Sequence, residues 1–224
     1  MSNDKLKSAP EAIKCISSGS VVMIGGFMGC GSPKYVLDKL AETNVRNLTV
    51  ISNDTDFEGV GVGKLVKRGM ISRLIASHIG TNPETGRKLN SGEIAVELNP
   101  QGTLAERIRA GGAGLGGFLT PTGFGTIIEN GKKKMEINGQ TYLLETPLKA
   151  DVALIKAYKA DEFGNLVFRG ATRNFNLIMA TAAEYVIAEV EEHVRIGGID
   201  PEDVMLPGIF VDCIVRGCAQ NVQC

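Results

Sequence analysis

The stretch VVMIGGFMGCGSP, residues 21–33, decides the fold class of this chain. Its first four residues are all apolar, which is typical of a strand buried on both faces of a parallel sheet. A run of glycines follows, and Pro33 then fits the first turn of a helix over residues 33–43. The stretch therefore predicts a buried strand, a sharp turn and a helix.

Strands and helices continue to alternate after this stretch. Residues 47–54 are typical of a second buried strand that ends in polar residues, and residues 62–71 are typical of a helix. A third strand centres on residues 74–76, another covers 93–100, and a helix over 102–112 is closed by glycine. This alternation predicts an α/β fold with a mostly parallel sheet flanked by helices.

The second half of the chain contains a hairpin signal. The dipeptide Asn138-Gly139 lies between two strand-like runs within residues 132–146, and it favours a two-residue turn. We therefore expect a small β-hairpin insertion in a single domain over residues 1–224. Further strands are expected over 151–161, 163–168 and 185–190, and further helical segments over 9–18 and from 174 to about 183.

Composition excludes several classes of function. The chain has 224 residues, 43% of them hydrophobic, and a formal net charge of -1, so no basic excess argues for nucleic acid. The sequence contains no run of roughly 18 apolar residues, so no membrane span is expected. Five cysteines form no C-x-x-C pair, which favours reduced thiols in a cytoplasmic protein. His78 and His193 lie far apart in the sequence, so no metal site is expected.

The glycines after the first strand fail the tests for common nucleotide-binding loops. A G-x-G-x-x-G motif that starts at Gly29 would need glycine where the sequence has Lys34. Neither a P-loop nor a G-x-S-x-G nucleophile elbow is present. The turn still offers backbone N–H groups, which can hold a phosphate, a carboxylate or a thioester carbonyl. A tight turn without a ligand explains the pattern equally well.

Polar and glycine residues gather where the first three predicted strands end. They occupy residues 25–31, 52–54 and 77–80. Because ligands of open parallel sheets bind beyond the carboxyl ends of the strands, we expect a site at this edge.

Six stretches of the sequence together resemble one protein family. They are GGFMGCGSP, ISNDT, SHIGTNPETGRKLNSGE, VELNPQGTLAERIRAGGAGLGGFLTPTGFGT, ADVALIKA and RNFN. In this order they resemble the A (alpha) subunit of family I coenzyme A transferases, of the acetate/butyrate–acetoacetate or 3-oxoacid type. The piece G-G-F-x-x-x-G-x-P over residues 25–33 matches the signature of that family, and the resemblance extends from about residue 5 to residue 217.

The resemblance implies a fold of the CoA-transferase-like (NagB-RpiA-like) kind and a ping-pong reaction. In such enzymes a glutamate attacks an acyl-CoA thioester and becomes a glutamyl-CoA thioester, from which a second carboxylic acid takes the CoA. No cofactor is bound, because the coenzyme A thioester is the substrate. The glutamate belongs to a Ser-Glu-Asn-Gly motif of the B subunit. Here Glu129-Asn130-Gly131 follows Ile128 instead of serine, and we do not assign it.

The implied partner is therefore a homologous B (beta) chain, in an α2β2 or larger assembly, with neither nucleic acid nor membrane involved. By resemblance, Asn53 helps to form the oxyanion hole for the thioester carbonyl. An Asx turn that closes the strand is the alternative for Asn53. The loop that contacts CoA comprises Gly25, Gly26, Phe27, Met28, Gly29, Cys30 and Gly31. Cys30 is expected to be a small buried thiol in a tight turn, not a nucleophile.

Two other functions remain open. The chain could be a non-catalytic CoA-binding or scaffolding subunit, which would bind CoA without its partner. It could also be a sugar-phosphate isomerase of related architecture, but the convergent lysine and acidic residues that such an enzyme needs at strand ends are not seen. The roles of His78 and Arg109 are not assigned.

Overall fold

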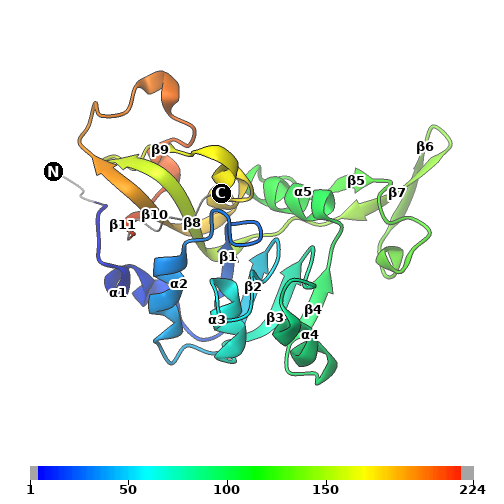
Figure 1. Cartoon of the computed structure of the whole chain (residues 1–224). Coiled ribbons are helices and arrows are strands. Elements are labelled where there is room, and N and C mark those ends of the chain that lie inside the picture. The colour runs from blue at the N-terminus through cyan, green and yellow to red at the C-terminus, as the bar shows by residue number, and fades with distance from the viewer. Residues whose placement is uncertain (1–4, 218–224) are drawn as a thin grey trace.

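The computed structural model describes residues 5–217, which form a large sheet, flanking helices and a projecting three-stranded arm (Figure 1). The strands of the large sheet are β1 Val21–Ile24, β2 Leu48–Ser52, β3 Ile71–Ala76, β4 Ala95–Leu98, β8 Ala150–Asp161, β9 Leu166–Val167, β10 Ala183–Val194 and β11 Cys213–Arg216. The α-helices are α1 Ala9–Ala12, α2 Lys34–Ala41, α3 Val62–Lys67, α4 Pro83–Asn90, α5 Gln101–Gly112 and α6 Asn176–Ala180.

The strand order is β11-β10-β8-β1-β2-β3-β4, and every pair along this path is parallel. Among the strands of this sheet within residues 5–217, only β9 is antiparallel, where it pairs with β8. The predicted parallel α/β sheet is confirmed, and β1 lies inside it between β2 and β8. The carboxyl end of β1 therefore opens at the middle of the sheet edge, where ligands of such sheets bind.

Strand β1 contributes to two hydrophobic cores. Val22 and Ile24 pack with Leu37 and other apolar residues of one core, and Met23 packs with Leu104 and the second core. These three strand residues are at most 1% exposed. Successive side chains of a strand point to opposite faces, so a strand covered on both faces is apolar throughout. This explains the unbroken apolar run in the sequence.

The projecting arm is a three-stranded antiparallel sheet in the order β5-β7-β6. Its strands are β5 Phe118–Thr120, β6 Lys134–Ile137 and β7 Gln140–Glu145, and the arm leaves the end of α5 (Figure 1). Asn138 and Gly139 have φ values of 51° and 76° and join β6 to β7, as the hairpin prediction requires. The third strand, β5, comes from the glycine-rich segment and was not predicted.

Several boundaries differ from the sequence-based expectations. Pro33 lies at the N-cap of α2 rather than within its first turn. The helix expected to end near residue 183 ends at Ala180, because β10 already begins at Ala183 and continues to Val194. The helical segment expected over 9–18 ends at Cys15 as a short 3₁₀ turn. The remaining 3₁₀ turns are Ile127–Glu129, Gly170–Arg173, Pro201–Asp203 and Gly208–Phe210.

Two elements of the large fold were missed. Helix α4 has only Thr85 buried, so it lacks the apolar stripe by which a helix is found in a sequence. Asn82 is the N-cap of α4, and its side chain accepts a hydrogen bond from the Glu84 N–H. Pro83 follows in the first turn. Strand β11 is a four-residue segment and offers too short a pattern.

Within residues 5–217, no helix is long and apolar enough to cross a membrane. Cys15 and Cys213 are free thiols in the same part of the chain, whereas Cys218 and Cys224 lie outside the described residues.

Candidate functional site

The segment Gly25–Gly31, hereafter the glycine turn, contains a two-residue hairpin. The N–H groups of Phe27 and Cys30 each donate to the carbonyl oxygen of the other residue, both at 2.9 Å. The two central residues, Met28 and Gly29, have φ values of 49° and 80°, the sign that a type I′ turn needs. The Phe27 and Met28 side chains are about two-fifths exposed, so the hairpin presents two apolar side chains at the surface.

Carboxylates of this chain occupy the central N–H groups of the hairpin. Met28 N donates to Asp54 Oδ2 at 2.9 Å, and Gly29 N donates to Asp56 Oδ1 at 2.8 Å. Ser32 Oγ also donates to Asp56, at 3.0 Å to Oδ1. The expectation that the turn offers its N–H groups to a phosphate or other anion is therefore wrong at Met28 and Gly29.

Asp56 connects the glycine turn to helix α3. Its Oδ2 atom accepts a hydrogen bond from Val62 N at 2.9 Å, and a Cβ atom on Gly61 would lie 1.9 Å from the same oxygen. Burial raises the pKa of Asp56 above its ordinary value, and the negative charge of Asp54 adds to this shift. The hydrogen bonds from Val62, Ser32 and Gly29 oppose the shift but do not outweigh burial.

Asn53 lies at the end of β2 and is 2% exposed. Its Nδ2 donates to Asp54 Oδ2 at 2.8 Å, while its Oδ1 accepts from Ser77 Oγ and Gln101 Nε2, each at 2.8 Å. A carboxylate only accepts, so the contact with Asp54 fixes which end of the amide is Nδ2. One of the two Nδ2 hydrogens is thereby used.

The Asx turn expected as the alternative role of Asn53 is formed by its neighbour. Asp54 Oδ1 accepts from the backbone N–H of Asp56, two residues further along, at 2.7 Å. Asn53 is therefore not needed for closing the strand, and its amide is aligned by the neighbouring Asp54 and by Ser77 and Gln101 from two other segments. Asp54, Asp56 and Gln101 were not identified as site residues, although the run Ser52-Asn53-Asp54-Thr55-Asp56 directly after a buried strand was a usable signal.

The first and last glycines of the turn allow a side chain to approach closely. Asn176 Nδ2 donates to Gly31 O at 3.0 Å, and a Cβ atom on Gly25 would lie 1.8 Å from Asn176 Oδ1. Asn174 Nδ2 donates to Cys30 O at 3.1 Å. Both asparagines belong to the stretch Arg173–Asn176, so the last of the six family-like stretches packs on the first. Cys30 lies in the expected tight turn but is only partly buried.

Other candidate residues lie outside this cluster. Arg109 pairs with Glu106 on the surface of α5. Glu129 lies in the arm, where its carboxylate accepts from Lys134 Nζ and Gly125 N, both at 2.7 Å, and Lys134 lowers its pKa. The backbone of His78 contacts the site, where His78 N donates to Asn53 O at 3.2 Å. Among residues 5–217 no group of His, Cys, Asp and Glu is arranged to hold a metal ion.

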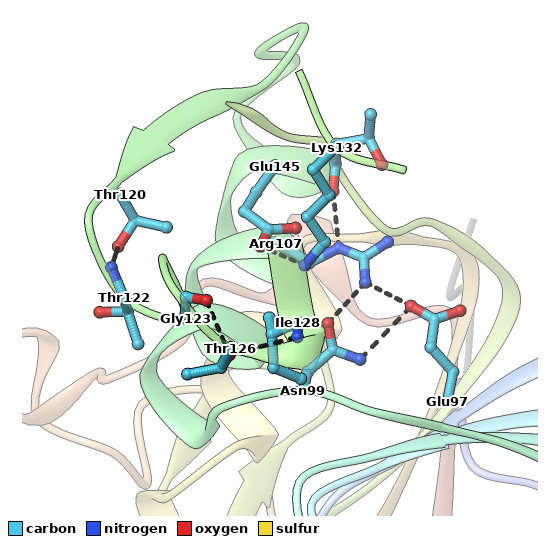
Figure 2. A network of polar contacts seen from close by, with 11 residues as sticks. Glu97, Asn99, Arg107, Thr120, Thr122, Gly123, Thr126, Ile128, Lys132 and Glu145 are labelled. Atoms are coloured by element: carbon cyan, nitrogen blue, oxygen red, sulfur yellow. Dashed lines mark hydrogen bonds and ion pairs between the residues drawn. The ribbon is translucent and has the colours of Figure 1, made fainter. Parts of the chain in front are cut away.

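Arg107 fixes the base of the arm (Figure 2). Its Nη1 donates to Glu97 Oε1 at 2.6 Å and to Asn99 Oδ1 at 2.7 Å, and its Nε donates to Thr146 O at 2.8 Å. These contacts join the end of β4, helix α5 and the end of β7. The sequence pattern does not reveal this role of Arg107, because its partners lie on other elements.

The chain matches the family model described as Coenzyme A transferase over residues 6–217. It is 54% identical to the acetoacetyl-CoA:acetate/butyrate CoA transferase alpha subunit of Clostridium acetobutylicum, over 96% of this chain and 98% of that one. It is 49% identical to the acetate CoA-transferase subunit alpha of Escherichia coli K12, over 94% and 96%.

A solved structure shares the fold. It is an acyl-CoA transferase of Escherichia coli O157:H7 in a thioester complex with CoA, with a TM-score of 0.88 at 23% identity. The match covers 98% of this chain and 48% of that one, so this chain spans about half of that protein. The family model and the two close relatives cover nearly all of the sequence, and this chain therefore belongs to the coenzyme A transferase family.

Proposed function

We propose that this chain is the A subunit of an enzyme that moves CoA between a short-chain acyl-CoA and a carboxylic acid such as acetoacetate, acetate or butyrate. Two relatives that are about half identical are named as alpha subunits of such transferases. The observation that carries the proposal is the Asn53 amide, aligned at the carboxyl end of a central strand by Asp54, Ser77 and Gln101. The Asn53 amide is therefore a hydrogen-bond donor at the edge of the sheet where ligands of parallel sheets bind.

In the proposed reaction a glutamate of the B subunit attacks the thioester carbonyl. The tetrahedral intermediate carries negative charge on the former carbonyl oxygen, and the second Nδ2 hydrogen of Asn53 donates to it. An aligned amide donor of this kind contributes about 10²–10³ in rate. The CoA thiolate leaves, so that the acyl group and the glutamate form a mixed anhydride. The thiolate then attacks the glutamyl carbonyl, which releases the first carboxylic acid and forms the glutamyl-CoA thioester, and the second acid takes the CoA from it.

The glycine turn lines the thioester end of the substrate in this proposal. Phe27 and Met28 offer apolar surface there, whereas the N–H groups of Met28 and Gly29 are already bonded to carboxylates. The turn therefore contacts the uncharged part of the substrate and not its phosphates. Residues 1–224 act as one domain, in the cytoplasm, in an assembly of two or more A and B chains.

The test is reconstitution with a B chain. The A chain alone should show no transfer between acetoacetate and an acyl-CoA, and the A–B complex should be active. Asn53→Ala should lower kcat by about 10²-fold or more while the complex still assembles, because the lost donor acts on the transition state.

Asn165→Ala is the matched control. Asn165 also donates from Nδ2 to an aspartate, Asp161, at 2.8 Å, but in the turn between β8 and β9. This variant should keep the wild-type kcat. Turnover by the isolated A chain, or a wild-type kcat for Asn53→Ala, would contradict the proposal. Tight CoA binding by the A chain alone, measured by calorimetry, with an inactive A–B complex would instead favour a non-catalytic binding subunit.

A further inference from the structure

We propose that Asp54 and Asp56 are positioning residues for the transfer reaction, which hold the glycine turn and the Asn53 amide in one fixed geometry. The inference rests on the proposed function and extends it to two side chains that do not touch the substrate. The two carboxylates are buried, at 3% and 2% exposed. They accept hydrogen bonds from backbone N–H groups and neutral side chains.

Asp54 connects the two parts of the site through one atom. Its Oδ2 accepts from Asn53 Nδ2 at 2.8 Å and from Met28 N at 2.9 Å. Any movement of the glycine turn therefore shifts the position of the Asp54 oxygen that orients the Asn53 amide. Because Ser77 and Gln101 hold Asn53 Oδ1, the contact with Asp54 completes the alignment and directs the remaining Nδ2 hydrogen.

Asp56 fixes the same turn from a second side. It accepts from Gly29 N, Ser32 Oγ and Val62 N, and these donors come from the hairpin, the chain just after it and the start of α3. Three donors thus reach each carboxylate, since Asp54 also accepts from Asp56 N. Only a side chain that accepts through both of its terminal atoms, as a carboxylate does, can bond all three donors. An amide in the same place would direct its own N–H groups against backbone N–H groups.

The Asp56 carboxylate lowers stability, which argues against a purely structural role. The pKa of Asp56 is raised in the folded protein, first by burial and then by the charge of Asp54. A carboxyl group with a raised folded pKa favours the folded state below its unfolded pKa, and this stabilisation is lost as the pH rises through the folded value. Ionised Asp56 therefore costs stability at neutral pH. Groups retained at a cost to stability are typical of functional sites.

The first variant is Asp54→Asn in the A–B complex. It places an amide nitrogen against the donors of one oxygen, so kcat should fall by about 10- to 100-fold, because the Asn53 donor loses its alignment. Hydrogen exchange of the Met28 and Gly29 amides should be at least about 10-fold faster than in the wild type. Asp161→Asn is the matched control, because Asp161 is 4% exposed and accepts from Asn165 N at 2.9 Å away from the site.

The second variant is Asp56→Asn, which releases the glycine turn without touching Asn53. Its main effect should be a KM for acyl-CoA that rises about 10-fold, with a smaller change in kcat. Ser32→Ala removes one donor and no charge, and it should give a KM increase of about 2- to 5-fold in a stably folded complex. This split between kcat and KM is not expected from a general loss of stability.

The inference is overturned if Asp54→Asn and Asp56→Asn keep wild-type kinetics and amide exchange, or if they change only as much as Asp161→Asn does. If the Asn variants do not assemble, wild-type kinetics and exchange in Ser32→Ala overturn it. An inactive wild-type A–B complex would count against the proposed function alone, because the exchange rates of Met28 and Gly29 still decide whether the carboxylates hold the turn.

Discussion

The glycine turn and the arm are both rich in glycine, but Gly25 of the turn and Gly139 of the arm need glycine for different reasons. In the glycine turn, Gly25 and Gly31 lie against the Asn176 side chain, and a Cβ atom at Gly25 would overlap with it. In the arm, a Cβ atom at Gly131 or Gly139 would meet no other atom within 4 Å, and both residues have positive φ. Glycine is thus required for space at residue 25 and for backbone conformation at residues 131 and 139.

The largest expected effect comes from filling the space at Gly25. Gly25→Ala should lower the free energy of unfolding by about 3 kcal/mol, because the new methyl group displaces Asn176 from the hydrogen bonds that it makes with Lys156 N and Gly31 O. For a chain of this size, that corresponds to a thermal midpoint lower by roughly 6–12 °C.

Gly139→Ala is the paired change in the arm. It should cost only about 1 kcal/mol, because the turn conformation is strained but no atom is displaced. Gly86→Ala in α4 has open space and no positive φ, so it should be neutral or slightly stabilising. Equal losses for Gly25→Ala and Gly139→Ala would show that close approach is not the reason for glycine at residue 25.

The second effect concerns the attachment of the arm. Arg107→Ala leaves Glu97, Asn99 and the Thr146 carbonyl without their shared donor, which should cost about 2–3 kcal/mol in urea unfolding. Arg109→Ala, two residues further along the same helix, removes an exposed ion pair and should leave the midpoint nearly unchanged. A similar loss in both variants would show that the polar contacts of Arg107 with β4 and Thr146 do not explain the effect.

The smallest effect is expected at Glu129 in the arm. Glu129→Gln should leave the transfer rate of the A–B complex unchanged. This carboxylate is bonded to Lys134 and Gly125 in the arm, outside the glycine turn. Steady-state kinetics with acetoacetate and an acyl-CoA provide the measurement. A rate lower by about 10²-fold or more would identify the Glu129-Asn130-Gly131 turn as part of the catalytic machinery.

The sequence predicts best what depends on local patterns. The apolar run of β1 and the Asn138-Gly139 turn are both found because neighbouring residues determine them. Helix α4 was missed because it buries almost no side chains and so lacks an apolar stripe. Strand β11 was missed because its four residues are too few to show a strand pattern, and it forms by pairing with β10. The start of β10 was displaced because a helical pattern continues into it.

The candidate site was predicted only in part for a similar reason. Asn53 was singled out because it ends a predicted buried strand and because the family resemblance implies a role in the oxyanion hole, and this role in transfer stays a prediction. Asp54 and Asp56 were not identified because their partners in the glycine turn lie 26 and 27 residues away in the sequence. Hydrogen bonds between a carboxylate and a distant backbone N–H leave no periodic signal.

The pairing of β1 with β8 has a consequence for the order of folding. Strand β1 needs β8 as its second neighbour, and the Asn176 side chain that bonds Gly31 O is 145 residues later in the chain. At typical rates of synthesis, roughly 7–30 s pass before Asn176 follows Gly31 from the ribosome. The contacts of the glycine turn with Asp54 and Asp56 are therefore available early in synthesis, whereas its contact with Asn176 forms only late.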